Sequence, residues 1–175
     1  KGSTLEGGQR VCMISWGPGH IPAGTKCSEL ATTMDLLPTF AGLAGAELDP
    51  DRVIDGKDIA PLLTGAEGVK TPHEAFFYYY QGQLQAVRSG PWKLRVAHTP
   101  LRGKNPRPVP AALFNLESDI AESTDVIADH PDVVVELQAH AEQIRTELGD
   151  VEKGIVGKST RKPGSVDNAK TLTTN

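Results

Sequence analysis

Four short runs in the middle of the sequence most constrain how this chain can fold. They read EAFFYYY, LQAVRSG, WKLRV and ALFNL. Short runs rich in aromatic and branched residues, separated by turn residues, are typical of β-strands. WKLRV alternates strictly, with Trp92, Leu94 and Val96 on one face and Lys93 and Arg95 on the other. The turn Ser89-Gly90-Pro91 predicts a hairpin between the second and third runs.

One long helix is expected after these runs. Asp129 or His130 is placed to cap it, and Pro131 suits its first turn. Apolar residues then recur at helical spacing: Val133, Val134, Leu137, Ala141, Ile144 and Leu148. We therefore predict an α+β fold in which a small antiparallel sheet of about four strands packs with helices.

The N-terminal half predicts further elements. Residues from Gly8 to Trp16 are apolar on both faces, which indicates a strand covered on both sides. Asp35 is placed to cap a helix that ends near Gly45. Its apolar stripe comprises Leu36, Leu37, Phe40, Leu43 and Ala44. A short helical turn is expected over 59–63.

Composition limits the classes of partner. The formal net charge of −4 argues against nucleic acid, because phosphate binding needs a basic surface. No apolar run approaches the roughly 20 residues that span a bilayer, so no membrane partner is expected. Cys12 and Cys27 are too few for a disulfide framework and lack metal-site spacing. Free thiols and a Cys12–Cys27 bridge both remain open.

Self-contained catalytic motifs are missing from the sequence: there is no phosphate-binding glycine loop, no metal-spaced His/Cys cluster and no G-x-S-x-G. Lys1 stands out physically, because it begins KGSTLEGG, whose small residues allow close approach to a ligand. An ammonium group there suits an anion. Glu6 and Arg10 flank the paired glycines and are predicted to form an ion pair that sets this loop.

Several strings in order carry a family resemblance. They are KGSTLEGGQRV, MISWGPGHIPAGT, ELATTMDLLPTFAGLAGA, RVIDGKDIAPLLTG, AFFYYYQGQLQAVRSGPWKLRV and LFNLESDIAESTDVIADHP. Together they resemble the C-terminal part of type I sulfatases, the arylsulfatase-like family of the alkaline-phosphatase-like superfamily. The resemblance covers residues 1–150. It implies that residues 1–70 end a catalytic domain and that residues 71–150 form the antiparallel sheet and C-terminal helix, followed by a polar, extended or disordered tail over 151–175.

The resemblance also implies where the chemistry lies. In this family a C-x-P-x-R or S-x-P-x-R motif supplies formylglycine, and an Asp/Asn quartet binds a calcium ion. This chain contains neither element, so calcium and formylglycine are expected upstream in the full-length enzyme and no metal ligand is assigned here. Lys1 matches the family lysine that points at the sulfate and offsets charge developing in the transition state. Lys1 is therefore the one residue assigned as catalytic.

A second group of residues is assigned to substrate binding. Tyr80, Gln81 and Gln83 end a strand in a loop, and loops of this part of the family line the substrate pocket. Aromatic and amide side chains there suit a sugar or aryl ring. Ordinary packing remains the alternative for all three.

The leading hypothesis is the C-terminal fragment of a sulfuric ester hydrolase that cleaves aryl or carbohydrate sulfates. A chain that begins at the sulfate lysine is expected to be truncated and inactive alone. Its expected partners are the N-terminal catalytic domain and a sulfated small molecule or glycan. The family favours a periplasmic or secreted location. Two alternatives remain: a phosphodiesterase or phosphonate hydrolase of the same superfamily, and a non-catalytic module that binds glycans or a partner.

Overall fold

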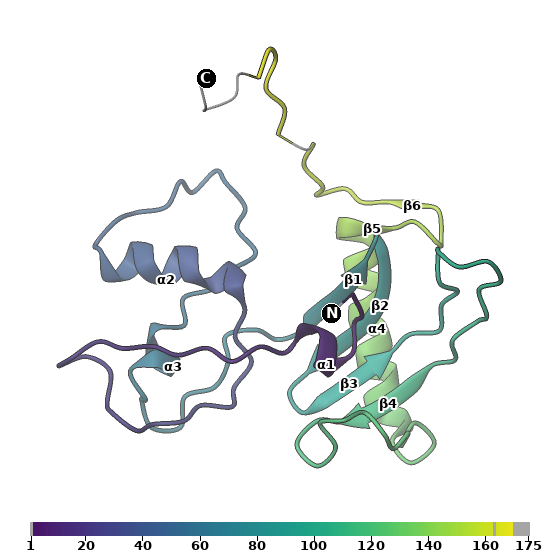
Figure 1. Ribbon diagram of the computed structural model, residues 1–175, viewed down its shortest axis with the longest axis horizontal. Helices are drawn as coiled ribbons and strands as arrows, with labels where there is room; N and C mark the ends of the chain where they lie inside the picture. Colours follow the sequence, from purple (N-terminus) through teal and green to yellow (C-terminus); the bar gives the residue numbers. More distant parts are fainter. Residues whose placement is uncertain (1, 163, 170–175) are drawn as a thin grey trace, which may run out of the picture.

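The computed structural model describes residues 2–162 and 164–169. Two lobes lie side by side (Figure 1). The first, which we call the sheet lobe, comprises residues 71–150. The second, the helical lobe, comprises residues 11–70. Residues 2–10 lie against the sheet lobe. Beyond residue 150, the Lys158 amide donates to the Thr146 carbonyl of the sheet lobe, and the Arg161 guanidinium donates to the Val53 carbonyl of the helical lobe at 3.1 Å.

The sheet lobe is an antiparallel meander of four strands. These are β1 (Phe76–Tyr80), β2 (Gln83–Ser89), β3 (Trp92–Arg95) and β4 (Ala112–Asn115). They pair in the order β1-β2-β3-β4. The α+β class and the four predicted strands are confirmed.

Two tight turns set the register of the first three strands. Gln81 and Gly82 between β1 and β2 have φ of 55° and 79°, the pattern of a type I′ turn. Gly90, with φ of 52°, opens the turn between β2 and β3, so the hairpin predicted from Ser89-Gly90-Pro91 is confirmed. A register shift between Tyr78 and Tyr79 adds a bulge to the β1–β2 pair.

The long helix α4 (Pro131–Leu148) covers one face of the sheet (Figure 1). Pro131 occupies its first turn after His130, and Gly149 ends it with φ of 84°, as the sequence predicts. The core between helix and sheet consists of Leu84, Val87, Leu94, Val96, Leu113, Leu137 and Ala141. Trp92 packs at its edge, with its ring 4.5 Å from that of His130.

The N-terminal half contains only short elements. They are α1 (Glu6–Gln9), the 3₁₀ turn η1 (Thr33–Asp35), α2 (Leu36–Leu43) and α3 (Ala60–Leu63). The strand predicted over Gly8–Trp16 is wrong: residues 10–16 carry no regular structure, and Ile14 and Trp16 are 94% and 86% exposed. A strand needs a neighbour to take its backbone hydrogen bonds, and no described segment pairs with this stretch.

Asp35 has a wider role than the predicted cap. Asp35 stands at the N-cap position of α2, as predicted, but its side chain makes no cap hydrogen bond to that helix. It belongs instead to the capping box of η1, in which Thr32 is the N-cap residue and the Asp35 carboxylate accepts from the Thr32 amide at 2.6 Å. The same fully buried carboxylate accepts from the Lys57 amide at 2.8 Å and lies 2.8 Å from His73 Nε2. Asp35 thus ties three separate segments together at the junction of the lobes.

The chain after α4 begins with a two-residue ribbon. β5 (Gly149–Asp150) pairs with β6 (Ile155–Val156), and the Tyr79 hydroxyl donates to the Gly149 carbonyl at 2.9 Å. Burial and the nearby Asp150 charge raise the pKa of Tyr79 to about 12. Residues 157–162 and 164–169 contain no helix or strand. No described helix is both long and apolar enough to cross a bilayer.

Candidate functional site

The candidate site is the segment that follows Lys1. Lys1 itself lies outside the described residues. Residues 2–10, which we call the lysine segment, cover the face of the sheet opposite α4 (Figure 1). Thr4 and Glu6 point into this interface and are 9% and 3% exposed.

The lysine segment folds back on itself. A Cβ atom on Gly8 would lie 2.5 Å from Ser3 Oγ and 2.6 Å from the Ser3 carbonyl oxygen, a distance that no side chain tolerates. Gln9 Nε2 also donates to the Ser3 carbonyl at 2.8 Å. The second of the paired glycines is therefore needed to close this loop, which gives the GG of the motif a physical reason.

Lys93 is the centre of the contact between the segment and the sheet. Its side chain is 1% exposed. Its Nζ donates to the Thr4 carbonyl at 2.7 Å and to Glu6 Oε1 at 3.0 Å, and it pairs with Glu122 Oε1 at 2.9 Å. The Tyr78 ring lies beneath the ammonium, with 4.2 Å to its centroid. Three donors therefore meet three acceptors, two of them in the lysine segment.

Glu122 holds the same segment from the other side. Its Oε2 accepts from the backbone amide of Glu6 at 2.6 Å. Glu122 adopts a left-handed φ of 54° within the 119–124 loop, which Asp119 fixes. The Asp119 carboxylate accepts from the amides of Thr124 and Ser123, both at 2.8 Å, and these bonds lower its pKa. The 119–124 loop thus presents Glu122 to the lysine segment.

Glu6 is the acid through which the segment engages the sheet. Its Oε1 also accepts from the Tyr78 hydroxyl at 3.0 Å, and its Oε2 lies 3.8 Å from Arg88 and 3.4 Å from Arg10. The predicted Glu6–Arg10 ion pair is therefore confirmed. Burial alone would raise the pKa of Glu6, but the hydrogen bond and charge of Lys93, with Tyr78 and Arg88, outweigh it and lower that pKa.

The buried charges balance within this cluster. Glu6 and Glu122 face Lys93 and Arg88, so two carboxylates meet two cations. Among the described side chains, no buried nitrogen or oxygen lacks a hydrogen-bond partner. The cluster is complete in itself, and it has no free group that could act as a base or nucleophile.

The predicted substrate-binding residues do not share one environment. Gln83 is fully buried, and its amide donates to the Thr99 carbonyl and to Glu152, both at 2.8 Å. Gln81 is exposed on the β1–β2 turn, where its amide oxygen faces the Arg102 guanidinium, 2.8 Å from Nε. Tyr80 is half-buried beside it. Of the three, only Tyr80 and Gln81 therefore offer accessible atoms.

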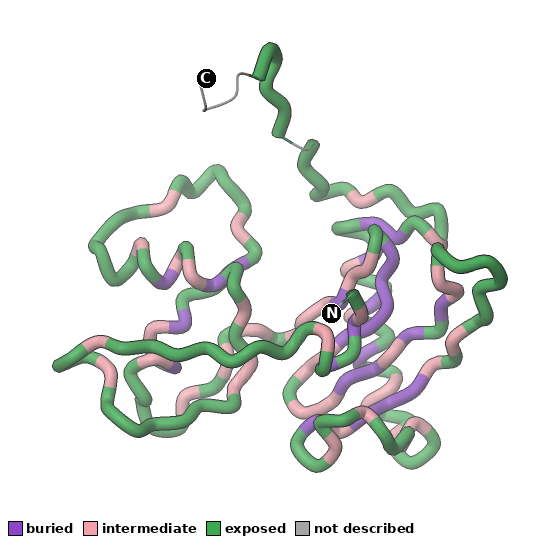
Figure 2. The backbone as a smooth tube through the Cα atoms, viewed as in Figure 1, coloured by how far each residue is buried: buried purple, intermediate pink, exposed green. Residues whose placement is uncertain are grey.

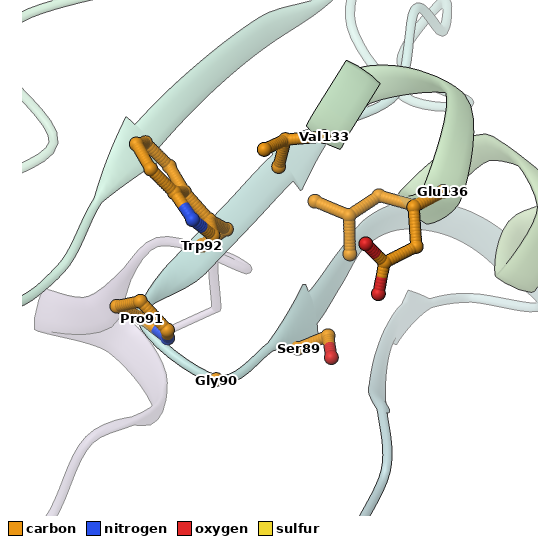
Figure 3. Close-up of a pocket in the computed structure, with 7 residues that line it drawn as sticks. Ser89, Gly90, Pro91, Trp92, Val133 and Glu136 are labelled. Atoms are coloured by element: carbon orange, nitrogen blue, oxygen red, sulfur yellow. The ribbon is translucent and has the colours of Figure 1, made fainter. Parts of the chain in front are cut away.

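A cavity of about 210 Å³ lies on the α4 side of the sheet, at the β2–β3 turn (Figure 3). Trp92 and Val133 form apolar walls, and Ser89 and Glu136 supply its polar atoms. The Ser89 hydroxyl already donates to the Glu74 carbonyl at 2.7 Å. Because the lysine segment covers the opposite face, this cavity is not part of the candidate site.

The described residues do not fit the metal or the nucleophile that the resemblance implies. No group of three or more His, Cys, Asp or Glu side chains among them is arranged to hold an ion. Cys12 and Cys27 are both free and exposed, so the bridge left open by the sequence is not formed. Neither cysteine lies in the motif that yields formylglycine.

Comparison with known proteins identifies the family. The family model for the C-terminal region of aryl-sulfatase matches residues 71–167, more than half of the chain. The chain therefore belongs to the arylsulfatase-type sulfatases, as a C-terminal part.

Individual relatives agree with this assignment. Steryl-sulfatase of Mus musculus is 47% identical over 98 residues, which are 53% of this chain and 15% of that protein. Arylsulfatase A of Bos taurus is 37% identical over 158 residues, which are 79% of this chain and 30% of that protein. A solved structure titled "Crystal structure of Ps i-CgsB" matches with a TM-score of 0.57 and 25% identity, over 81% of this chain and 30% of that one. The chain thus spans less than a third of these relatives.

Sequence reasoning missed Lys93 and Glu122 as parts of the site. The alternation in WKLRV correctly separates Lys93 from the core face, but it carries no information about what covers the other face. Glu122 follows a loop with no periodic pattern. The sequence offers a weak signal for this contact: a lysine lies within a strand that is otherwise rich in apolar residues, and a glutamate lies in the Glu-Gly-Gly motif far from it in the sequence.

Proposed function

We propose that this chain is the C-terminal part of a sulfuric ester hydrolase acting on aryl or carbohydrate sulfates, with Lys1 contacting the sulfate. One observation carries the proposal: the lysine segment, which follows Lys1, is held on the sheet by hydrogen bonds from Lys93 to the Thr4 carbonyl and the Glu6 carboxylate. A buried clamp on a surface segment supports a role that requires a fixed position. The family membership supports the type of reaction.

The proposed role of Lys1 is electrostatic. Sulfate ester cleavage develops negative charge on the sulfuryl or leaving oxygen as the S–O bond breaks. An ammonium group held beside that oxygen stabilises the transition state more than the ground state. Calcium and a formylglycine nucleophile, in this proposal, are supplied by an N-terminal catalytic domain.

The exposed apolar residues of the helical lobe support such a partner. Val11, Ile14 and Trp16 are more than three-quarters exposed, and Phe40 and Leu43 of α2 are more than half exposed. Large apolar side chains exposed in such number on one lobe are typical of an interface. We assign it to the N-terminal domain, against which residues 10–16 would gain the strand pairing they lack here.

The decisive experiment is turnover of a chromogenic aryl sulfate by the longer protein. Lys1→Ala is expected to lower kcat by about a hundredfold or more, as for loss of a transition-state donor. Lys158→Ala, which removes an exposed lysine from the chain after α4, is the matched control and should leave kcat unchanged. A Lys1→Ala enzyme with normal kcat would show that Lys1 is not at the sulfate.

Substrate recognition is proposed for the β1–β2 turn. Tyr80 and Gln81 are its accessible members, while Gln83 supports the turn from within through Thr99 and Glu152. Gln81→Ala should raise KM for the substrate with little change in kcat, because it removes binding rather than transition-state stabilisation. An unchanged KM would remove the turn from the substrate site.

A phosphoryl-transfer enzyme of the same superfamily is distinguished by the nucleophile of the N-terminal domain. A Cys or Ser in a C/S-x-P-x-R motif supports the sulfatase, and a plain Thr nucleophile supports phosphoryl transfer. A non-catalytic module predicts tight binding of a sulfated glycan with no release of inorganic sulfate. Assays for sulfate and phosphate release from matched esters distinguish all three.

A further inference from the structure

We propose that Lys93 is a positioning residue, which acts through Glu6, Thr4 and Glu122 to hold the Lys1-bearing segment in its working position. This inference rests on the proposed function of Lys1. It assigns a part in catalysis to a β-strand lysine that does not itself touch the substrate.

The geometry points to positioning rather than to a general contribution to stability. A buried ion pair is weak evidence for stability, since removing charges from water offsets much of their mutual attraction. A buried ion pair does, however, favour one arrangement of the chain over others, because a buried charged group left without a partner raises the free energy of the folded state. Lys93 satisfies its three donors only when the Thr4 carbonyl and the Glu6 carboxylate are both in place. A shift of the segment by one residue would take the Glu6 carboxylate away from Lys93 and leave Glu122 as the carboxylate that pairs with it.

We call the contacts of Lys93 with Thr4, Glu6 and Glu122 the clamp. Glu122 and Tyr78 add further contacts to it from the sheet lobe. Glu122 pairs with Lys93 through Oε1 and accepts the Glu6 amide through Oε2. One carboxylate therefore connects the sheet cation to the backbone of the lysine segment. Tyr78 closes the cluster, donating to Glu6 while its ring lies under the Lys93 ammonium. Lys1 is close to this clamp in the sequence, three residues before Thr4.

The experiment uses the longer protein with Lys93→Met, a variant of similar length that removes the charge and all three donors. Arg95→Met is the matched control, since Arg95 is the next cation on the same face of β3 and contacts the Pro110 carbonyl instead of the lysine segment. Glu122→Gln is a milder variant that removes a charge but keeps an acceptor, in case Lys93→Met fails to fold.

The first readout is hydrogen exchange of residues 4–10, which needs no activity. The Glu6 amide is bound to a side chain, so its exchange reports the clamp directly. Lys93→Met and Glu122→Gln should speed exchange of this segment severalfold, with β2 and α4 unchanged, and Arg95→Met should not. Unchanged exchange in a folded Lys93→Met protein would overturn the proposal.

The second readout is a double-mutant cycle with Lys1→Ala. Lys93→Met should lower kcat by about tenfold with little change in KM, but should have no further effect once Lys1 is absent. Independent, multiplying effects would mean that Lys93 does not act through Lys1 and would overturn the proposal. A wild-type protein without sulfate ester turnover would instead refute the proposed function, and the exchange experiment would still decide whether Lys93 holds the segment.

Discussion

The two lobes contain similar apolar sequence patterns and use them differently. In the sheet lobe, β2, β3, β4 and α4 close around one core, whereas most of the helical lobe is exposed or only half-buried (Figure 2). Of the buried hydrophobic residues described, all but Ile59 and Leu62 lie outside the helical lobe. Phe40 and Leu43, on the predicted stripe of α2, are 56% and 63% exposed.

The difference shows that an apolar pattern in the sequence predicts which face of an element is buried, but does not predict which other element covers that face. The sheet lobe has its own cover in α4. No described helix covers the apolar face of α2 in this way. The segments of the helical lobe are instead joined by buried polar contacts, such as those of the Asp35 carboxylate with His73 and with the Lys57 amide. Such a lobe is consistent with the docking on an N-terminal domain that we propose.

The largest contrast is expected from truncating one residue in each lobe. Leu113→Ala removes a fully buried β4 side chain and should lower the free energy of unfolding by about 2–5 kcal/mol. Phe40→Ala on exposed α2 should change it by about 0.5 kcal/mol or less. Urea denaturation followed by circular dichroism measures both. Equal losses would show that α2 is covered in solution, and would remove the contrast between the lobes.

Two glycines of the helical lobe distinguish its tightly packed part from its exposed part. A Cβ on Gly56 would lie 2.0 Å from the Met34 carbonyl oxygen, so Gly56→Ala should cost about 1–3 kcal/mol by forcing this backbone apart. Gly42 in α2 has no neighbour nearer than 3.7 Å, and Gly42→Ala should stabilise by about 0.5–1 kcal/mol. Thermal unfolding of the pair tests this. A Gly56→Ala variant with an unchanged melting temperature would mean that the backbone around Asp35 is packed less tightly than the structure shows.

The charged clamp of the sheet lobe predicts a pH dependence. The pKa of Glu6 is lower in the folded chain than its ordinary value of 4.5, so Glu6 contributes stability above that value. This stability is lost as the pH falls through the folded value. Glu6→Gln should therefore flatten the loss of stability below about pH 4.5. Denaturant titrations from about pH 3 to 7 measure the slope. Parallel slopes for the two proteins would contradict the lowered pKa.

The smallest effect on stability is expected at the exposed N-terminal stretch. Ile14→Ser and Trp16→Ser should change the free energy of unfolding by about 0.5 kcal/mol or less, because both side chains are already in water. They should nevertheless reduce self-association of the isolated chain, as measured by light scattering. A large loss of stability would show that these residues pack within the chain itself.

Most of the sheet lobe could be predicted from the sequence because its signals are local. Gly90 and Pro91 set a tight turn, and Pro131 and Gly149 bound α4, in each case through the backbone angles that these residues favour. The strand predicted over Gly8–Trp16 does not form. Its apolar pattern is real, but a strand needs a paired neighbour, and no described segment pairs with residues 10–16.

The candidate site likewise contains contacts that local spacing predicts and contacts that depend on the tertiary fold. The Glu6–Arg10 pair was predictable, since four residues of spacing place the two side chains on one side of a helical turn. Glu122 was not, because its place depends on the 119–124 loop and on a left-handed φ. The placement of Tyr80 and Gln81 at the sulfate ester remains a prediction, as does the role of Lys1.

By itself the sequence determined the strands, their turns, the long helix and the resemblance to the sulfatases, because each follows from short-range spacing and motif order. Only the tertiary structure decided that Lys93 is buried and that residues 2–10 cover it. Lys93 and Glu6 are 87 residues apart, and no periodicity connects them. Alternation along a strand assigns a side chain to a face, whereas burial of a charge requires the chain to return and supply the opposite charge.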